Sequence, residues 1–274
     1  MGDFEVDTRV AGEAGIYSGK LSSDWAIWGP NGGYVASVAL RAAGREAAIP
    51  RPVSFSCHFI SVARFDVVEL AVTPLHRGRR AESIHVRMTQ EGRPILAAML
   101  RTALPGPGLT HAFAVPPKVA PPEELLTFAE LYPDQPRAPH AFWNNIDVKP
   151  IEPRDPSVPP RATAPTYRQW NRFTPRATFE DPFVDAARLL VLIDTMGWPA
   201  ASRAHVEPKF QAPNLDVNVW FHRAEPEEPW LLSDHESPLA EAGLMATTGR
   251  VWSRRGRLLA SGGGQLMCLP TTPA

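Results

Sequence analysis

Two strand-like stretches, PVSFSCHFISVARF at 52–65 and PNLDVNVWFHRAEP at 213–226, decide the fold of this 274-residue chain. Each contains an alternating apolar run that closes on a phenylalanine, Phe59 in the first and Phe221 in the second. Aligning Phe59 with Phe221 sets the stretches 162 residues apart, and the segments around them follow in the same order. Self-similarity at a fixed offset is the signature of a repeat. We therefore expect two similar halves.

The same series of elements surrounds each stretch. A helix-like run precedes it, and two further extended segments follow, with a tight turn predicted at Glu91-Gly92 and again at Arg255-Gly256. Successive strands without helices between them predict an antiparallel sheet with one long helix lying on it. Each half is therefore expected to be α+β. The matched segments are 32–48, 66–90 and 91–103 in the first half, and 187–204, 230–254 and 255–269 in the second.

Hydrophobic periodicity supports this interpretation. Ile84, Val86 and Met88 alternate with polar residues, which is typical of a strand with one covered face. In contrast, the run 189–202 is apolar on nearly every side, with Asp194 as its only charged residue. A helix enclosed by a curled antiparallel sheet fits both patterns.

Proline marks the joint between the halves. Of the 30 prolines, 15 lie between residues 104 and 165, where fixed φ and missing N–H donors exclude regular helix or sheet interiors. Within this region the segment 122–132 has the apolar spacing of a short amphipathic helix. We expect an N-terminal unit over 1–112, a connecting strap over 113–138 and a C-terminal unit over 139–274.

Composition excludes several classes of partner. The 28 Lys and Arg against 29 Asp and Glu leave a net charge of −1, so no basic footprint for nucleic acid or an anionic membrane is expected. No run of 18 apolar residues occurs, which predicts no membrane insertion. Cys57 and Cys268 are too few for a disulfide framework, which predicts a reducing, cytoplasmic location. The eight histidines form no HExxH pair, so neither a metal nor a cofactor is expected.

Asp194 is the first candidate for chemistry. A carboxylate in an apolar helix is costly unless it is paired or used, and burial raises its pKa toward that of a general base working near neutral pH. An aspartate held by a neighbouring Arg, Trp N–H or hydroxyl is the structural alternative, and residue type alone leaves both open. The offset of 162 places Asp194 opposite Gly32, which suggests that the halves have specialised.

Four segments together resemble the double-hotdog acyl-CoA thioesterase II family. The resemblance covers nearly the whole chain, and the duplicated architecture and the VNVWFHR strand are its strongest parts. It implies a tandem of two hotdog folds, each a curled antiparallel sheet around one long helix, arranged like a dimer of single hotdogs. It also implies acyl-CoA thioesters as substrates. The four segments are NGGYVASVAL (31–40), LLVLIDTMGWPA (189–200), PNLDVNVWFHR (213–223) and GRLLASGGGQLMCL (256–269).

The resemblance implies a trio of Asp, a small polar residue and Gln that orients and activates the hydrolytic water. These roles fall on Asp194, Asn214 and Gln265. Asn214 replaces the hydroxyl residue of the family, and its amide is still able to hold a water. The three glycines at 262–264 place one extra residue before Gln265, which predicts either a β-bulge that re-aims its side chain or a break in the match.

Four further residues are expected to meet the substrate. Gly32 and Gly33 open a helix, where free N–H groups would polarise a thioester carbonyl, although close helix packing is the commoner use of glycine and is preferred here. Met196 and Trp198 follow the proposed base and are expected to line the acyl tail.

The resulting hypothesis is hydrolysis of acyl-CoA to free fatty acid and coenzyme A by carboxylate-activated water. A non-catalytic acyl-CoA-binding or lipid-binding double hotdog is the alternative, and the Asn214 and glycine departures favour it. A hotdog hydratase is the third possibility, against which the absence of a GDxNPxH pattern argues. Exposed sheet edges and faces make a homodimer or homotetramer plausible.

Overall fold

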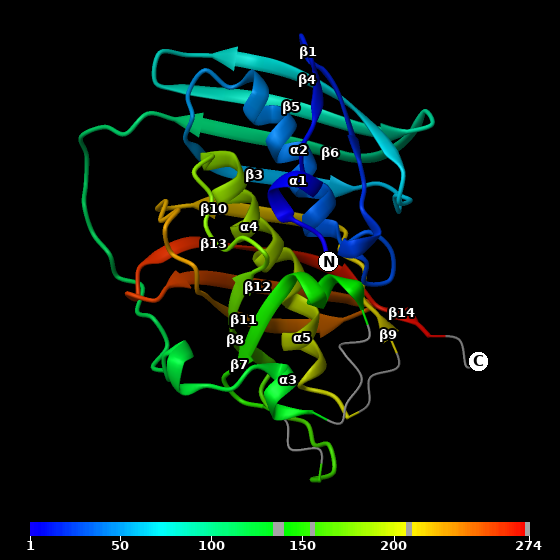
Figure 1. Ribbon diagram of the computed structural model, residues 1–274, viewed down its shortest axis with the longest axis vertical. Coiled ribbons are helices and arrows are strands. Elements are labelled where there is room, and N and C mark those ends of the chain that lie inside the picture. Colours follow the sequence, from blue (N-terminus) through cyan, green and yellow to red (C-terminus); the bar gives the residue numbers. More distant parts are fainter. Residues whose placement is uncertain (134–139, 154–156, 207–209, 272–274) are drawn as a thin grey trace.

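Two long helices pack side by side at the centre of the molecule, and one continuous sheet curls around both (Figure 1). The computed structural model describes residues 1–133, 140–153, 157–206 and 210–271. The helices are α2 (Gly32–Glu46) and α4 (Pro182–Thr195), one from each half of the chain. The predicted tandem of α+β hotdog units, each a curled sheet wrapped around a long helix, is confirmed.

The sheet has twelve strands, and all of its neighbouring strands are antiparallel. The halves meet where the strand ending at Phe59 pairs with the strand ending at Phe221, so the two stretches that revealed the repeat also form the joint. In sheet order the strands are β1 (Ala11–Glu13), β2 (Ile16–Lys20), β4 (Val67–Arg77), β5 (Ala81–Gln90), β6 (Arg93–Ala103), β3 (Pro52–Phe59), β10 (Asp216–Phe221), β13 (Leu258–Met267), β12 (Leu244–Ser253), β11 (Leu231–Glu241), β8 (Thr166–Phe173) and β7 (Ile146–Pro150).

Short elements complete the described chain. Most of them lie at the ends of the sheet or in the connections between strands. They are the helices α1 (Phe4–Asp7), α3 (Phe128–Leu131) and α5 (Gly197–Ser202), the 3-10 turns η1 (Ser23–Trp25), η2 (Pro122–Glu124) and η3 (Ala141–Asn145), and the two-residue strands β9 (Phe210–Gln211) and β14 (Leu269–Pro270).

The second central helix differs from its expected span of 187–204. It begins five residues earlier, because the Asp181 side chain caps the backbone N–H of Phe183 and Pro182 occupies the first turn, where its missing N–H costs nothing. It ends at Thr195, and the chain continues as the separate helix α5. Pro199 has no N–H to donate to Thr195, which accounts for the break. From Phe183 to Thr195 every residue of α4 is buried, as the apolar run predicted for the part from residue 189 onward.

The strand predictions hold in detail. Ile84, Val86 and Met88 are fully buried on one face of β5. The turn before β6 places Glu91 and Gly92 at φ 52° and 75°, which is the left-handed pair of a tight hairpin. A further hairpin of this kind, at Ala242-Gly243, was not predicted, because alanine carries no turn signal of its own.

The offset of 162 holds for the strands and fails for the helices. The helices begin at Gly32 and Pro182, which are 150 residues apart, and α5 with its flanking loops fills the difference in the second half. The predicted equivalence of Asp194 with Gly32 is therefore wrong. With the helices superposed by their starts, Asp194 corresponds to Gly44, and Gly33 corresponds to Phe183.

Contacts between the helices confirm this correspondence. A Cβ on Gly33 would lie 3.0 Å from the Cβ of Asp194, and a Cβ on Gly44 would lie 2.6 Å from the ring of Phe183. The two contacts are equivalent, because exchanging the two halves turns the first contact into the second. A carboxylate faces glycine at one crossing, and a phenyl ring faces glycine at the other. The halves have specialised, as predicted, although through different pairs of residues.

The proline-rich connection packs against the outside of the second half (Figure 1). The segment expected as one helix over 122–132 is instead the 3-10 turn η2 followed by the single turn α3. Its neighbour Ala120 accepts a 3.0 Å hydrogen bond from the indole N–H of Trp170, which belongs to an apolar cluster with Trp230 and Trp252. The domain boundaries at 112 and 138 stay a prediction, and residues 134–138 of the strap lie outside the described residues.

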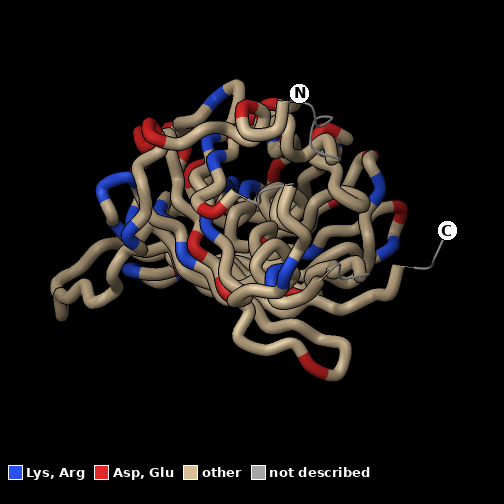
Figure 2. The backbone as a smooth tube through the Cα atoms, turned by 90° about the horizontal axis from the view of Figure 1, so that it is seen from below, with Lys and Arg blue, Asp and Glu red and all other residues tan. Residues whose placement is uncertain are grey.

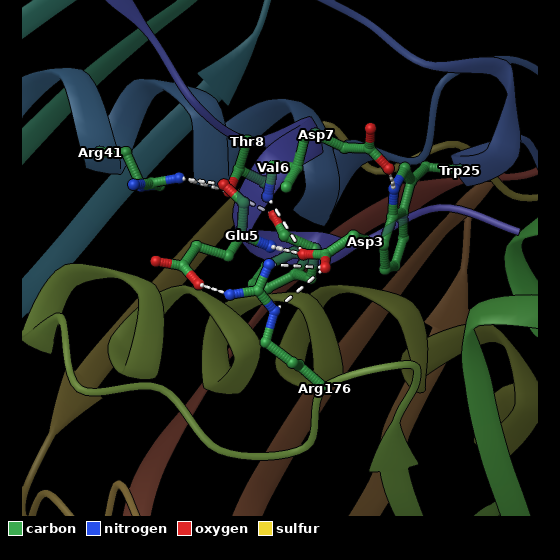
Figure 3. A network of polar contacts seen from close by, with 9 residues as sticks. Asp3, Glu5, Val6, Asp7, Thr8, Trp25, Arg41 and Arg176 are labelled. Carbon is green, nitrogen blue, oxygen red and sulfur yellow. Dashed lines mark hydrogen bonds and ion pairs between the residues drawn. The ribbon is translucent and has the colours of Figure 1, made fainter.

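The N-terminal segment forms polar contacts with elements of both halves (Figure 3). Arg176, just before α4, forms ion pairs with Asp3 and Glu5, and Arg41 of α2 donates to the Glu5 carbonyl. Charges of both signs are interspersed around the molecule (Figure 2). None of the described helices has the length and apolar character needed to cross a membrane.

Candidate active site

The Asp194 carboxylate lies in the last turn of α4, against the first turn of α2. Only 5% of the residue is exposed. Its Oδ2 accepts a 2.6 Å hydrogen bond from the backbone N–H of Gly33, and its Oδ1 accepts one from the side-chain amide of Asn214. The carboxylate is thus held by one group from each half of the chain. Within the described residues its partners are therefore an amide N–H of the backbone and a side-chain amide, and no arginine or tryptophan N–H is among them.

Asn214 reaches the carboxylate from the segment that leads into β10. Its amide also donates to the Asp194 backbone carbonyl at 2.9 Å, so it clamps both the side chain and the main chain of that residue. Asn214 forms an isolated bridge with Leu266, one position out of register with the rest of the β10–β13 ladder. The slip ends the regular alternation before β10. It allows Asn214 to face the helix although the outward residue Asp216 lies only two positions further along.

Burial raises the pKa of Asp194 to about 6. Loss of hydration is the largest cause, and the hydrogen bonds from Asn214 and Gly33 lower the pKa and offset part of it. A carboxylate with this pKa is mostly ionised at neutral pH and is still basic enough to take a proton from water. The predicted direction of the shift is confirmed.

Gly32 and Gly33 serve packing and hydrogen bonding at once. A Cβ on Gly33 would lie 2.8 Å from the Val191 Cα, so only glycine allows α2 and α4 to approach this closely. The same approach brings the Gly33 N–H to Asp194. The expectation that these glycines serve only helix packing is therefore incomplete, because Gly33 also donates a hydrogen bond. Gly32 lies beside the carboxylate and the ring of Phe59.

Gln265 does not join this group. The β12–β13 register is unbroken from Leu244 to Val251, so the predicted bulge at 262–264 is absent from that ladder. Gln265 pairs with Ala246 and is exposed, while its neighbour Leu266 is buried. Relative to the family pattern, one residue is added before Gln265. Because no bulge absorbs this residue, the Gln265 side chain points to the other face of the sheet. Within the described residues the Gln265 amide makes no hydrogen bond.

Close approach between strands explains the three glycines. A Cβ on Gly262, Gly263 or Gly264 would lie 2.0–2.1 Å from a carbonyl oxygen of a neighbouring strand. No other residue fits a backbone this close to both neighbours. The glycines are needed for the path of β13, and they do not re-aim Gln265.

The two residues expected along the acyl tail follow the carboxylate directly. Met196 is fully buried, and its sulfur lies 3.4 Å from the side-chain nitrogen of Gln169. Trp198, on α5, is partly buried and packs against a small apolar cluster that includes Met245 and Leu266. Both therefore lie between the helices and the sheet of the second half.

Two polar residues near the site were not predicted. Asn31 caps α2 through the Tyr34 N–H and also donates to the Thr195 hydroxyl at 3.1 Å, which locks the first helix onto the end of the second. Thr247 is buried beside Gly197 and donates to the Gly264 carbonyl. Asn31 had a sequence signal, since asparagine before a helix is a common cap. Thr247 had none, because only the folded sheet brings it near α5.

The described residues contain no cluster of three or more His, Cys, Asp or Glu side chains arranged to hold a metal ion. The site brings together a buried carboxylate, a side-chain amide and the start of a helix. This combination is suited to activating a water molecule beside a polarised carbonyl.

Solved structures place the fold in the hotdog class. The molecule matches the acyl-CoA thioesterase II TesB2 of Mycobacterium marinum with a TM-score of 0.80 and 22% identity, and the match covers 98% of each chain. A hot dog fold protein of Alicyclobacillus acidocaldarius matches over 99% of this chain and 98% of its own, with a TM-score of 0.81 and 22% identity.

Family models make the assignment specific. Residues 21–103 match the acyl-CoA thioesterase N-terminal domain, and residues 122–266 match the acyl-CoA thioesterase C-terminal domain. The chain belongs to the acyl-CoA thioesterase family, as the resemblance to thioesterase II implied. Human acyl-coenzyme A thioesterase 8 is 27% identical over 249 residues, which cover 83% of this chain and 76% of that protein.

Replacing Asn214 by alanine is expected to move the acidic limb of the pH–rate profile upward. The Asn214 hydrogen bond lowers the pKa of Asp194, so its loss raises that pKa and leaves less base ionised at a given pH. Losing one hydrogen bond to a charged group predicts a shift of about 1 pH unit. The measurement is kcat/KM for acyl-CoA hydrolysis between pH 4.5 and 9. An unchanged midpoint would show that Asp194 does not control this limb.

Replacing Gly33 by alanine is expected to lower kcat by more than the accompanying loss of folding stability accounts for. The added methyl group forces α2 away from Val191 and lengthens the hydrogen bond to Asp194, with a loss of roughly 1–3 kcal/mol of stability. The matched control is Gly44→Ala, which strains the equivalent crossing against Phe183. We expect the two variants to show similar melting temperatures, with kcat lowered only in Gly33→Ala. Equal kcat in both would reduce Gly33 to a packing residue.

Proposed function

We propose that this protein hydrolyses acyl-CoA thioesters with the Asp194 carboxylate as the base that activates water. The carrying observation is a buried carboxylate that no basic side chain among the described residues neutralises, held between the Gly33 amide and the Asn214 side chain. A carboxylate kept only for structure would be expected to sit in a neutralising ion pair, as the buried Asp185 does with Arg188.

The reaction follows from this geometry. Ionised Asp194 takes a proton from a water molecule as the water oxygen attacks the thioester carbonyl carbon. The C=O electrons move onto the carbonyl oxygen in the tetrahedral intermediate. When the intermediate collapses, the C–S bond breaks, and Asp194 returns the proton to the departing thiolate sulfur. The products are the free acid and coenzyme A, and the carboxylate is regenerated.

The start of α2 would stabilise the developing oxyanion. The backbone N–H of Gly32 makes no hydrogen bond to any described residue, and it lies at the positive end of a fifteen-residue helix. Because Gly32 adjoins the Asp194 carboxylate, one thioester would face both groups. Met196 and Trp198 would then bound the acyl chain on the side of the second half.

Asn214 would orient the water. Its amide nitrogen is engaged by Asp194, and its side-chain oxygen accepts no hydrogen bond from the described residues, so it is available to accept one from the water. Gln265 faces the outer side of the sheet, and we therefore assign the water-holding amide to Asn214 alone. The resemblance had divided this role between the two residues.

The direct test is release of free thiol from a panel of acyl-CoAs of increasing chain length. We expect turnover by the wild-type protein. Saturable binding of acyl-CoA without thiol release would instead support the non-catalytic alternative. A homodimer or homotetramer and a cytoplasmic location stay predictions, which sedimentation and cell fractionation would test.

A further inference from the structure

The inner face of the second half carries a buried imidazole without a hydrogen-bond partner. His235 points inward from β11 and is 2% exposed, and neither ring nitrogen makes a hydrogen bond with any described residue. The ring lies over Gly249, where a Cβ would come within 2.1 Å of its Nε2. Buried polar side chains almost always have partners, so one with two unpaired nitrogens needs an explanation.

The first half provides an internal control for this position. Strand pairing counted from Phe59 and Phe221 makes Val72 the equivalent of His235, because both occupy the same rung relative to those residues. The neighbouring inward positions differ in the same way. Leu70, Ile84, Val86 and Leu100 of the first half correspond to Ser233, Thr247, Gly249 and Gly264 of the second.

This contrast separates function from folding. The five inward side chains of the first half are apolar and buried, so the fold is satisfied by a plain hydrophobic core at these rungs. The second half replaces them with hydroxyls, an imidazole and glycines. The polar version occurs in the half whose helix carries Asp194, while the half with Gly44 at that helical position keeps the apolar version. The polar inward side chains and the proposed base, Asp194, therefore occur in the same half of the chain.

The polar face also adjoins the base in space. The His235 ring lies near the backbone carbonyl of Ile193, the residue before Asp194, outside hydrogen-bond geometry. Helix α5, which has no counterpart in the first half, packs over β8, β11 and β12 at this point. Met196 bridges the two regions, since it follows Asp194 by two residues and contacts Gln169 on β8.

The charge state of the imidazole defines the kind of group it can bind. Burial lowers the pKa of His235 to about 3, so the ring is neutral at every working pH. A neutral imidazole offers one donor and one acceptor. It suits a hydroxyl or a keto oxygen and gives no charge to balance a carboxylate.

We infer that His235 is a specificity-determining residue that hydrogen-bonds an oxygen substituent close to the thioester in the acyl chain. The preferred substrates are then hydroxyacyl-CoAs or oxoacyl-CoAs over unsubstituted acyl-CoAs of the same length. This inference rests on the proposed function, because it places the acyl group between α4–α5 and the sheet beside Asp194.

The test compares matched substrates in single variants. Wild-type protein, His235→Val and His235→Gln are assayed for kcat/KM with octanoyl-CoA, 3-hydroxyoctanoyl-CoA and 3-oxooctanoyl-CoA. Valine is the residue of the first half at this rung, so His235→Val copies a core that the same fold already accepts. His85→Val, on the outer face of β5, is the control for loss of a histidine.

We expect wild type to prefer an oxygenated substrate, and His235→Val to lose that preference by about tenfold while keeping its rate on octanoyl-CoA within about threefold. His235→Gln should restore part of the preference. The substrate ratio within one variant is independent of the folded fraction. An equal loss on all three substrates, or no wild-type preference, would overturn the inference. Absence of hydrolysis in every protein, wild type included, would instead count against the proposed function.

Discussion

Replacing Asp194 by asparagine is expected to lower kcat for acyl-CoA hydrolysis by about 10²- to 10⁴-fold, the contribution typical of a positioned general base. Asparagine has nearly the same shape, and its side-chain oxygen still accepts the Gly33 N–H. It has no basic site for the proton of water. The measurement is steady-state thiol release at pH 8, where the wild-type carboxylate is fully ionised.

The same substitution is expected to remove the pH dependence that Asp194 gives to the stability of the protein. The folded-state pKa of about 6 lies above the ordinary value of 3.8 for aspartate, so the unfolded chain releases its proton first as the pH rises. The native state therefore loses stability between about pH 4 and pH 6, by about 3 kcal/mol in all, and stays at the lower value at higher pH. The asparagine variant lacks this pH-dependent loss, and its own cost, the missing acceptor for the Asn214 amide, is the same at every pH.

Thiol release and urea unfolding together check this pair of effects. Urea unfolding at pH 4 and pH 8 should show that the stability of the variant, relative to wild type, is higher at pH 8 than at pH 4. Asp216→Asn, which changes an outward carboxylate of the same region, is the control and should keep both activity and stability. A folded Asp194→Asn protein with wild-type kcat would remove Asp194 from the mechanism.

Replacing Arg188 by methionine is expected to cost about 3–5 kcal/mol of stability, roughly 10 °C in melting temperature. Arg188 is buried in α4, pairs with Asp185 at 2.6 Å, and donates to the carbonyls of Ala177, Glu225 and Glu228. Its removal leaves a buried carboxylate and three carbonyls without their donor. Burial already raises the pKa of Asp185 and Arg188 lowers it, so the pKa rises further in the variant.

Two further variants separate the causes. Asp185→Leu combined with Arg188→Met removes both charges and should recover part of the loss, because well-packed apolar residues often replace a buried ion pair without penalty. Arg172→Met breaks the exposed pair with Asp147 and should cost less than about 1 kcal/mol. Thermal unfolding followed by circular dichroism measures all three variants. A small effect of Arg188→Met alone would show that the loop at 225–228 re-forms its bonds with water.

The repeat itself was determined by the sequence. Strand periodicity, the two phenylalanines of the matched strands and the tight turns are local signals, and hydrophobic alternation fixes which face of a strand is buried. Asp194 was also within reach, because one charge in a long apolar run is visible without a structure. The structure of the connection and the ends of the helices were harder to predict from sequence. Pro182 and Pro199 act by changing backbone hydrogen bonds, and hydrophobic periodicity contains no information about these bonds.

The tertiary structure decided which residues meet. Gly33 and Asp194 lie 161 residues apart in sequence, and only the crossing of α2 and α4 brings the amide to the carboxylate. Asn214 turns inward because the β10–β13 pairing slips by one residue, whereas Gln265 stays outside because the pairing of β13 with β12 is in regular register at that point. A one-residue slip reverses the face of a side chain, and pairing register is a property of two strands together, so neither strand's sequence alone contains it.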